Sequence, residues 1–164
     1  MENRLEKEIA FSRLEKAIDF AVQAHRGQTD KVGLPYILHP LAVMFYGKCE
    51  SERIVGVLHD VVEDTPYGIS DLNGMVGLTS EEEIALIALT HLKNEPYIDY
   101  IKRIANSNRL AIEVKLNDLF HNMSEERMMG LDEQTQVRLK KKYDIAWSML
   151  YSPGWPFILS TIQP

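Results

Sequence analysis

A short run of ionisable side chains interrupts an apolar segment at residues 56–64 (GVLHDVVED). Burying such groups is costly unless they are paired or hold a metal ion. In a helix, His59 and Glu63 lie on one strip, and Asp60 and Asp64 lie on the next strip round. A cation between the strips is within reach of His59 and Asp60, with the other two carboxylates one turn further along. The alternative interpretation is a capped helix end whose carboxylates are solvated.

A second polar cluster lies in residues 114–123 (VKLNDLFHNM), which also include His121. Asp118 and Asn122 are four residues apart, so a helix turns both toward one site. Lys115 precedes Asp118 by three residues, which makes these two side chains neighbours as well. Lys115 and Asp118 have a second interpretation, a surface ion pair that adds little stability.

His39, in the segment PYILHP, is the third candidate, although a lone histidine there is more often a core or capping residue. Together with the two clusters it completes a set of two nitrogen and two oxygen ligands: His39, His59, Asp60 and Asp118. This set suits Mn, Fe or Zn and lacks the thiolates of a structural zinc site. Four protein ligands leave positions for water and substrate only above four-coordination, which favours Mn or Fe over tetrahedral Zn.

The chain that must position these side chains has 164 residues, enough for one domain with at most a tail. Its 45% hydrophobic and 26% charged residues exclude a disordered or fibrous protein. No apolar run predicts a membrane span or a secretory leader, and the single cysteine, Cys49, excludes an internal disulfide. These features predict a cytoplasmic protein. The net charge of −6 argues against nucleic acid as a partner but permits a small anionic substrate in a local basic pocket.

Apolar spacing is helical along almost the whole chain. It predicts helices over 5–25, from Pro40 through 47, over 52–62 with Ser51 as N-cap, over 69–77, from 79 or 80 to about 91, and over 96–107, 109–124 and 132–151. Residues 28–38 contain Gly33 and Pro35 and indicate an ordered loop. The expected fold is an all-α, single-domain bundle of about eight helices over residues 1–152, with a tail over 153–164.

Four sequence blocks in a fixed order resemble the HD-type hydrolase domain of the Rel/SpoT enzymes. They are AVQAHRGQ (21–28), KVGLPYILHP (31–40), LHDVVEDT (58–65) and VKLNDLFHN (114–122). The resemblance covers roughly residues 14–125, and in size the chain is closest to the free-standing small alarmone hydrolases, such as the metazoan SpoT homologues. One block alone is a weak signal, but four in order are a strong one.

The resemblance implies an all-helical fold that holds one metal ion, usually Mn, on the four ligands named above. It implies that Glu63 and Asp64 position and deprotonate the attacking water. It also places Asn122 near the substrate ribose and Lys31 on the nucleotide-binding loop, and we expect Lys115 to contribute to substrate binding. The family reaction removes the 3′-pyrophosphate of ppGpp or pppGpp. The chain is shorter than a protein that also carries the family's synthetase domain, so hydrolysis alone is expected.

The loop Gln28-Thr29-Asp30-Lys31 departs from the family pattern, because Asp30 stands where the family has an arginine that packs on guanine. An aspartate cannot stack on a base, so we expect Asp30 to accept hydrogen bonds from a base edge instead. This departure leaves two alternatives to ppGpp hydrolysis. One is the same metal chemistry on another ribose-phosphorylated nucleotide, such as an adenosine alarmone analogue or NADPH. The other is a nucleotide sensor without catalysis.

Overall fold

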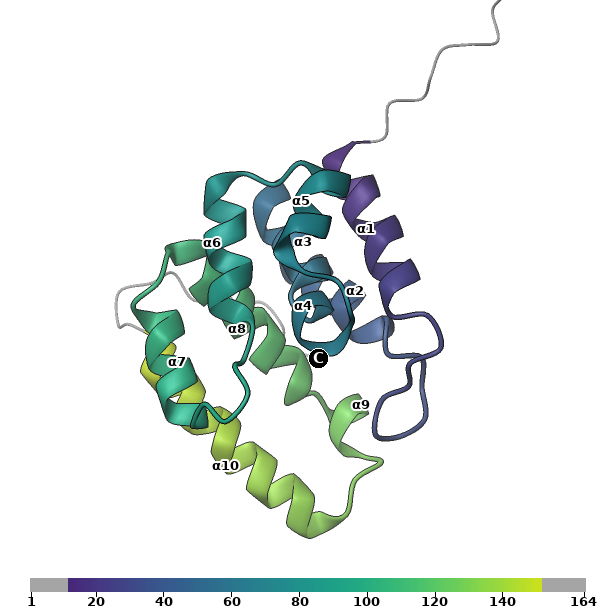
Figure 1. The fold of residues 1–164 in the computed structure, drawn as a ribbon. Coiled ribbons are helices and arrows are strands. Elements are labelled where there is room, and N and C mark those ends of the chain that lie inside the picture. The colour runs from purple at the N-terminus through teal and green to yellow at the C-terminus, as the bar shows by residue number, and fades with distance from the viewer. Residues whose placement is uncertain (1–11, 152–164) are drawn as a thin grey trace, which may run out of the picture.

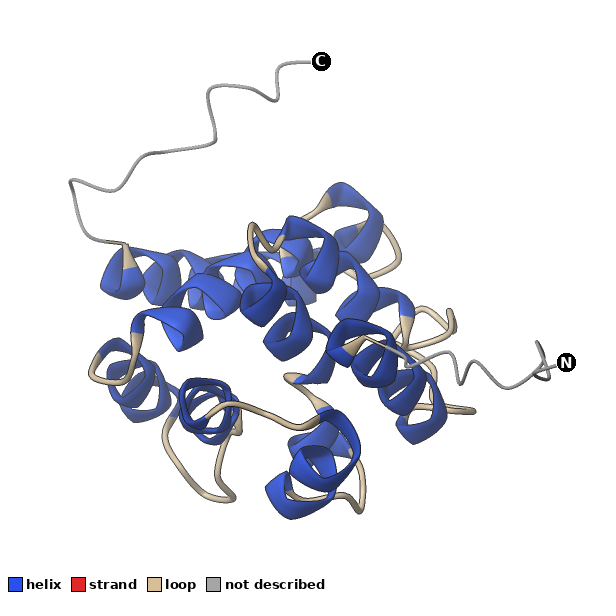
Figure 2. Cartoon of the chain, turned by 90° about the horizontal axis from the view of Figure 1, so that it is seen from above, coloured by secondary structure: helices blue, strands red, loops and turns tan. Residues whose placement is uncertain are grey.

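The computed structural model of the chain describes residues 12–151, which form helices joined by loops (Figure 2). The ten helices are α1 (Arg13–Ala24), α2 (Leu38–Tyr46), α3 (Glu50–Leu58), α4 (Val61–Asp64), α5 (Ile69–Val76), α6 (Ser80–Leu89), α7 (Tyr97–Ala105), α8 (Arg109–Asn122), α9 (Glu125–Met128) and α10 (Glu133–Leu150). Without the two four-residue helices α4 and α9, this is the all-α bundle of about eight helices that the sequence predicted. Residues 5–11 of the first predicted helix and the predicted tail over 153–164 lie outside the described range.

Helix α3 lies at the centre of the bundle, packed against α1, α2, α6 and α8 (Figure 1). Its apolar residues Ile54, Val55, Val57 and Leu58 are fully buried. Helix α10 runs along the opposite side of α8 and also packs against α7. None of the described helices combines the length and the apolar character that crossing a membrane requires.

Helices α2 and α3 approach each other closely at Gly56. A Cβ atom added there would lie 3.2 Å from the backbone Cα and N of Met44 on α2. A side chain at this position would therefore push the two helices apart. The close approach matters because His39 lies in α2 and His59 directly follows α3.

The second helix begins at Leu38, before Pro40 rather than after it as expected. Proline is tolerated in the first turn of a helix, where its missing N–H would have no intrahelical partner. The earlier start places His39 inside the first turn of α2, and this histidine is buried.

The predicted continuous helix over 52–62 is wrong at two points. Its N-cap is Cys49 rather than Ser51, and the chain leaves the regular helix at His59 and Asp60 before α4 begins. Asp60 has φ −97° and ψ −6°, in the sparsely populated region where many active-site residues lie. The break means that His59 and Asp60 are not oriented as neighbours in a regular helix.

A partly buried ion pair connects the first helix to α6. Glu82, which is fully buried, accepts hydrogen bonds from both terminal nitrogens of Arg13, at 2.7 and 3.0 Å. Its carboxylate also accepts the backbone N–H of Thr79, which closes a capping box at the start of α6. Although burial opposes ionisation, Arg13 and this N–H lower the pKa of Glu82.

Replacing Glu82 with alanine should lower the free energy of unfolding by about 1–2 kcal/mol, because α6 would lose its capping box and Arg13 its bidentate partner. Chemical denaturation followed by circular dichroism measures this change. Glu81→Ala, one residue earlier at an exposed position, is the matched control and should change the stability by less than about 0.5 kcal/mol. Equal effects of the two substitutions would contradict the structural role of the pair.

Candidate metal centre and its cavity

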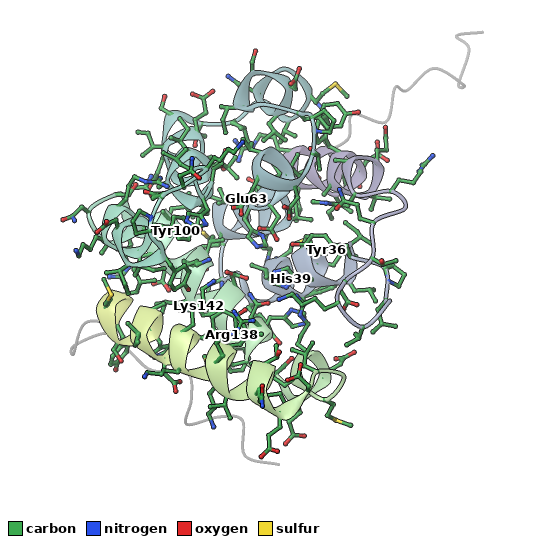
Figure 3. The ribbon with its side chains drawn as sticks, turned by 60° about the horizontal axis from the view of Figure 1, so that its bottom comes forward. Tyr36, His39, Glu63, Tyr100, Arg138 and Lys142 are labelled. Carbon is green, nitrogen blue, oxygen red and sulfur yellow. The ribbon has the colours of Figure 1, made fainter. Side chains whose placement is uncertain are left out.

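A cavity of about 410 Å³ opens between the loop before α2, the start of α2, α4 and the residue before it, and helices α7 to α10. Tyr36, His39 and Glu63 lie on one side of this opening, and Tyr100 and Lys142 lie on the other (Figure 3). Its lining includes nine of the residues that the sequence singled out: Asp30, Lys31, His39, Asp60, Glu63, Asp64, Lys115, Asp118 and Asn122.

The four predicted metal ligands converge at the floor of the cavity. Nε2 of His39 lies 3.1 Å from Oδ1 of Asp118 and 3.6 Å from Oδ2 of Asp60. Nε2 of His59 lies 3.0 Å from the same oxygen of Asp60 and 3.7 Å from that of Asp118. Adjacent ligands at right angles around an ion with bonds of about 2.1 Å are about 3 Å apart. The ligand atoms of His39, His59 and Asp60 lie within 4.8 Å of one another, which is compatible with ligands to one ion, and Asp118 lies beside both histidines.

The hydrogen bonds of His59 provide a test of whether a cation fits. Its Nδ1 lies 2.7 Å from the carbonyl oxygen of Gly56, so Nδ1 carries the proton and donates. Its buried Nε2 has no hydrogen-bond partner and faces two carboxylates. Although burial lowers it, Asp60 and Asp118 together raise the pKa of His59 to about 10. The two carboxylates thus favour a positive charge at this point, which either a proton on Nε2 or a divalent cation supplies.

Asp118 is kept ionised by its neighbours on α8 and around it. Burial alone would raise its pKa, but Lys115, followed by His39 and His59, holds the pKa well below the usual range. Lys115 Nζ donates to Oδ2 of Asp118 at 2.8 Å and lies over the ring of Tyr100. The amide of Asn122 donates to the other oxygen of this carboxylate. Lys115 and Asn122 line the cavity, and both also orient Asp118.

Two supporting residues have no assigned role in the sequence analysis. The hydroxyl of Tyr36 donates to Oδ2 of Asp60 at 2.5 Å, and Nδ1 of His121 lies 2.7 Å from Nδ1 of His39. Burial and the nearby His39 and Arg127 lower the pKa of His121 to about 4, so this ring is neutral. In the tautomer in which Nδ1 of His39 donates to Nδ1 of His121, Nε2 of His39 is free to ligate an ion. The sequence held a signal for the role of His121, because it follows Asp118 by three residues and so lies near it on a helix.

Glu63 and Asp64 lie at the wall of the same cavity, on α4. Glu63 accepts the backbone N–H of His91 at 3.0 Å. Partial burial, and then the negative charge of Asp60, raise the pKa of both carboxyl groups. A carboxylate with a raised pKa is a better base, so the pair has the properties needed to hold a water molecule and accept its proton.

The facing wall is basic, with Lys31, Arg127 and Lys142 among the lining residues. Lys142 on α10 lies 4.0 Å from the ring centre of Tyr97. Asp30 lies on this side too, but its oxygens are engaged by backbone N–H groups of its own loop and by Arg127. The cavity thus pairs an acidic wall beside the ligand cluster with a basic wall that favours an anion.

Comparison with known proteins identifies relatives among the Rel and SpoT enzymes. SpoT of Escherichia coli K12, named a bifunctional (p)ppGpp synthase/hydrolase, is 33% identical over 156 residues, 86% of this chain. A Spiroplasma citri protein named guanosine-3′,5′-bis(diphosphate) 3′-pyrophosphohydrolase is 31% identical over 174 residues, 97% of this chain. The GTP pyrophosphokinase of Streptomyces coelicolor is 32% identical over 133 residues, 74% of this chain. The chain spans only 16% to 23% of these relatives' length.

A solved structure shows the same fold, whereas no family model matches the chain. It comes from work on a metazoan SpoT orthologue that hydrolyses ppGpp and acts in starvation responses. The TM-score is 0.73 at 21% identity, over 85% of this chain and 86% of that chain. The fold and the convergent His and Asp side chains define a helical domain of the HD type. Within that class, the chain is a Rel/SpoT-type HD domain, as the four sequence blocks indicated.

Replacing His121 with leucine should weaken Mn²⁺ binding about 10- to 100-fold, because His39 would lose the acceptor that fixes its tautomer. Isothermal titration calorimetry measures the affinity. His121→Gln keeps a hydrogen-bond acceptor, so its Mn²⁺ affinity should lie between those of the leucine variant and the wild type. If both variants bind Mn²⁺ as the wild type does, His121 does not orient the ligand.

Proposed function

We propose that this chain is a metal-dependent phosphohydrolase that removes the 3′-pyrophosphate from ppGpp or pppGpp and leaves GDP or GTP. The convergence of four ligand side chains beside two carboxylates in one cavity carries this proposal. One of the relatives is named for hydrolysis of this nucleotide, one for both its synthesis and its hydrolysis, and one as a GTP pyrophosphokinase. Because the chain matches only part of each relative, the assignment to hydrolysis rests on the chemistry of the site.

We propose His39, His59, Asp60 and Asp118 as the ligands and Mn²⁺ as the ion, with Fe and Zn as alternatives. A bound ion of this kind lowers the pKa of water and offsets charge on phosphoryl oxygens. The four protein ligands already fill a four-coordinate ion. Mn²⁺ is favoured because its higher coordination number leaves room for water and substrate.

The other side chains around this centre have separate roles in the reaction. Glu63 and Asp64 hold the attacking water and take its proton as the water oxygen bonds to phosphorus. The bond between that phosphorus and the ribose 3′ oxygen breaks, and the 3′ oxygen regains a proton as the hydroxyl of the product. Lys31 and Lys142 on the basic wall attract the phosphate groups, and Asn122, which also lines the cavity, contacts the ribose.

The activity is tested by incubating the protein with ppGpp and Mn²⁺ and separating GDP and pyrophosphate by ion-exchange chromatography. Glu63→Gln and Asp64→Asn should each lower kcat about 10²- to 10⁴-fold, the usual contribution of a general base. Both variants should still bind Mn²⁺, since neither side chain belongs to the ligand set. Glu81→Gln, far from the cavity lining, is the control and should retain wild-type kcat.

Stabilisation of the protein by ppGpp without any turnover would instead favour a nucleotide sensor. Turnover of other ribose-phosphorylated nucleotides, with none of ppGpp, would keep the metal chemistry and overturn the guanosine assignment.

A further inference from the structure

The guanidinium group of Arg127, on α9, is fixed at the basic wall of the cavity by acceptors from two different segments. Its Nη2 donates to Oδ1 of Asn122 at 3.2 Å, and its Nη1 lies 3.5 Å from Oδ2 of Asp30. The side chain borders both the main cavity and a small adjoining cavity of about 40 Å³. Arg127 is therefore held in place before any ligand binds.

Asp30 has little hydrogen-bonding capacity left for a ligand. Its Oδ1 accepts the backbone N–H groups of Val32 and Leu34, at 3.0 and 2.9 Å, which shapes the loop before α2. Its Oδ2 faces Arg127, and only 10% of the side chain is exposed. The carboxylate is thus better placed to hold Arg127 than to contact the edge of a base.

A second contact joins the same loop to the turn after α9. A Cβ atom at Gly130 would lie 2.1 Å from Cγ1 of Val32, so only glycine permits this approach. The loop and the turn are therefore connected by packing as well as by the ion pair. Both contacts hold α9, and with it Arg127, against the loop before α2.

We propose that Arg127 determines specificity by stacking its guanidinium plane on the base of the bound nucleotide, with Asp30 as its positioning residue. The inference rests on the function proposed above. Two edges of the guanidinium are occupied and its charge is offset by Asp30, so the flat face remains for a planar group. Asn122 connects Arg127 to Asp118 in the ligand cluster, and Arg127 and Asp118 line the same cavity.

Stacking acts on any planar base, because every base has a π face. The contact with Arg127 therefore favours nucleotides over phosphate esters that lack a base, and it does not by itself select guanine over adenine. Guanosine and adenosine nucleotides are expected to bind with affinities that depend on Arg127 to a similar degree.

Calorimetric titration of the Mn²⁺-loaded protein with GDP, ADP and ribose 5-phosphate tests this proposal without requiring turnover. Arg127→Lys keeps the charge and loses the plane, so it should weaken GDP and ADP binding about ten-fold and leave ribose 5-phosphate unchanged. In the hydrolysis assay it should raise KM for ppGpp by a similar factor with little change in kcat. Arg26→Lys, an exposed arginine outside the cavity lining, is the matched control and should alter neither measurement.

Asp30→Asn keeps the acceptor for the loop N–H groups and removes the charge that faces Arg127. It should weaken GDP binding a few-fold in the wild-type background and have no further effect on Arg127→Lys. Equal weakening of ribose 5-phosphate and GDP in Arg127→Lys would overturn the stacking role, as would unchanged binding of both or a wild type that binds neither GDP nor ADP. A wild type that binds GDP without releasing pyrophosphate from ppGpp would instead contradict only the proposed function.

Discussion

Two buried histidines direct their Nε2 atoms at two carboxylates, and this arrangement is stable only around a positive charge. Nδ1 of His59 bonds to the carbonyl of Gly56, and Nδ1 of His39 lies 2.7 Å from Nδ1 of His121. Both Nε2 atoms therefore face Asp60 and Asp118. The proposed roles of Glu63, Asp64 and the basic wall depend on this convergence, because they would act on a phosphate only if an ion fixed its position.

Three local features of the backbone bring these side chains together. Gly56 brings α3 against α2, and the first turn of α2 tolerates Pro40 directly after His39. The break between α3 and α4 then lets consecutive residues, His59 and Asp60, both reach the same point. Asp118 comes from the middle of α8, whose apolar residues secure its position in the core.

Much of this arrangement could be predicted from the sequence, because the ionisable residues interrupt apolar segments where burial without a partner is costly. The all-helical fold and most helix positions followed from apolar spacing and capping residues. The break at His59 and the early start of α2 did not, since both depend on packing between distant helices. The roles of Tyr36, His121 and Arg127 were not predicted for the same reason: each contacts a residue that is distant in sequence or whose orientation depends on tertiary packing.

Diffraction from crystals grown with Mn²⁺, recorded near the manganese absorption edge, tests the central claim directly. The account predicts one anomalous peak about 2.0–2.3 Å from Nε2 of His39 and His59 and from an oxygen of Asp60 and Asp118. A peak elsewhere, or these four side chains in contact with no ion between them at saturating Mn²⁺, would contradict it.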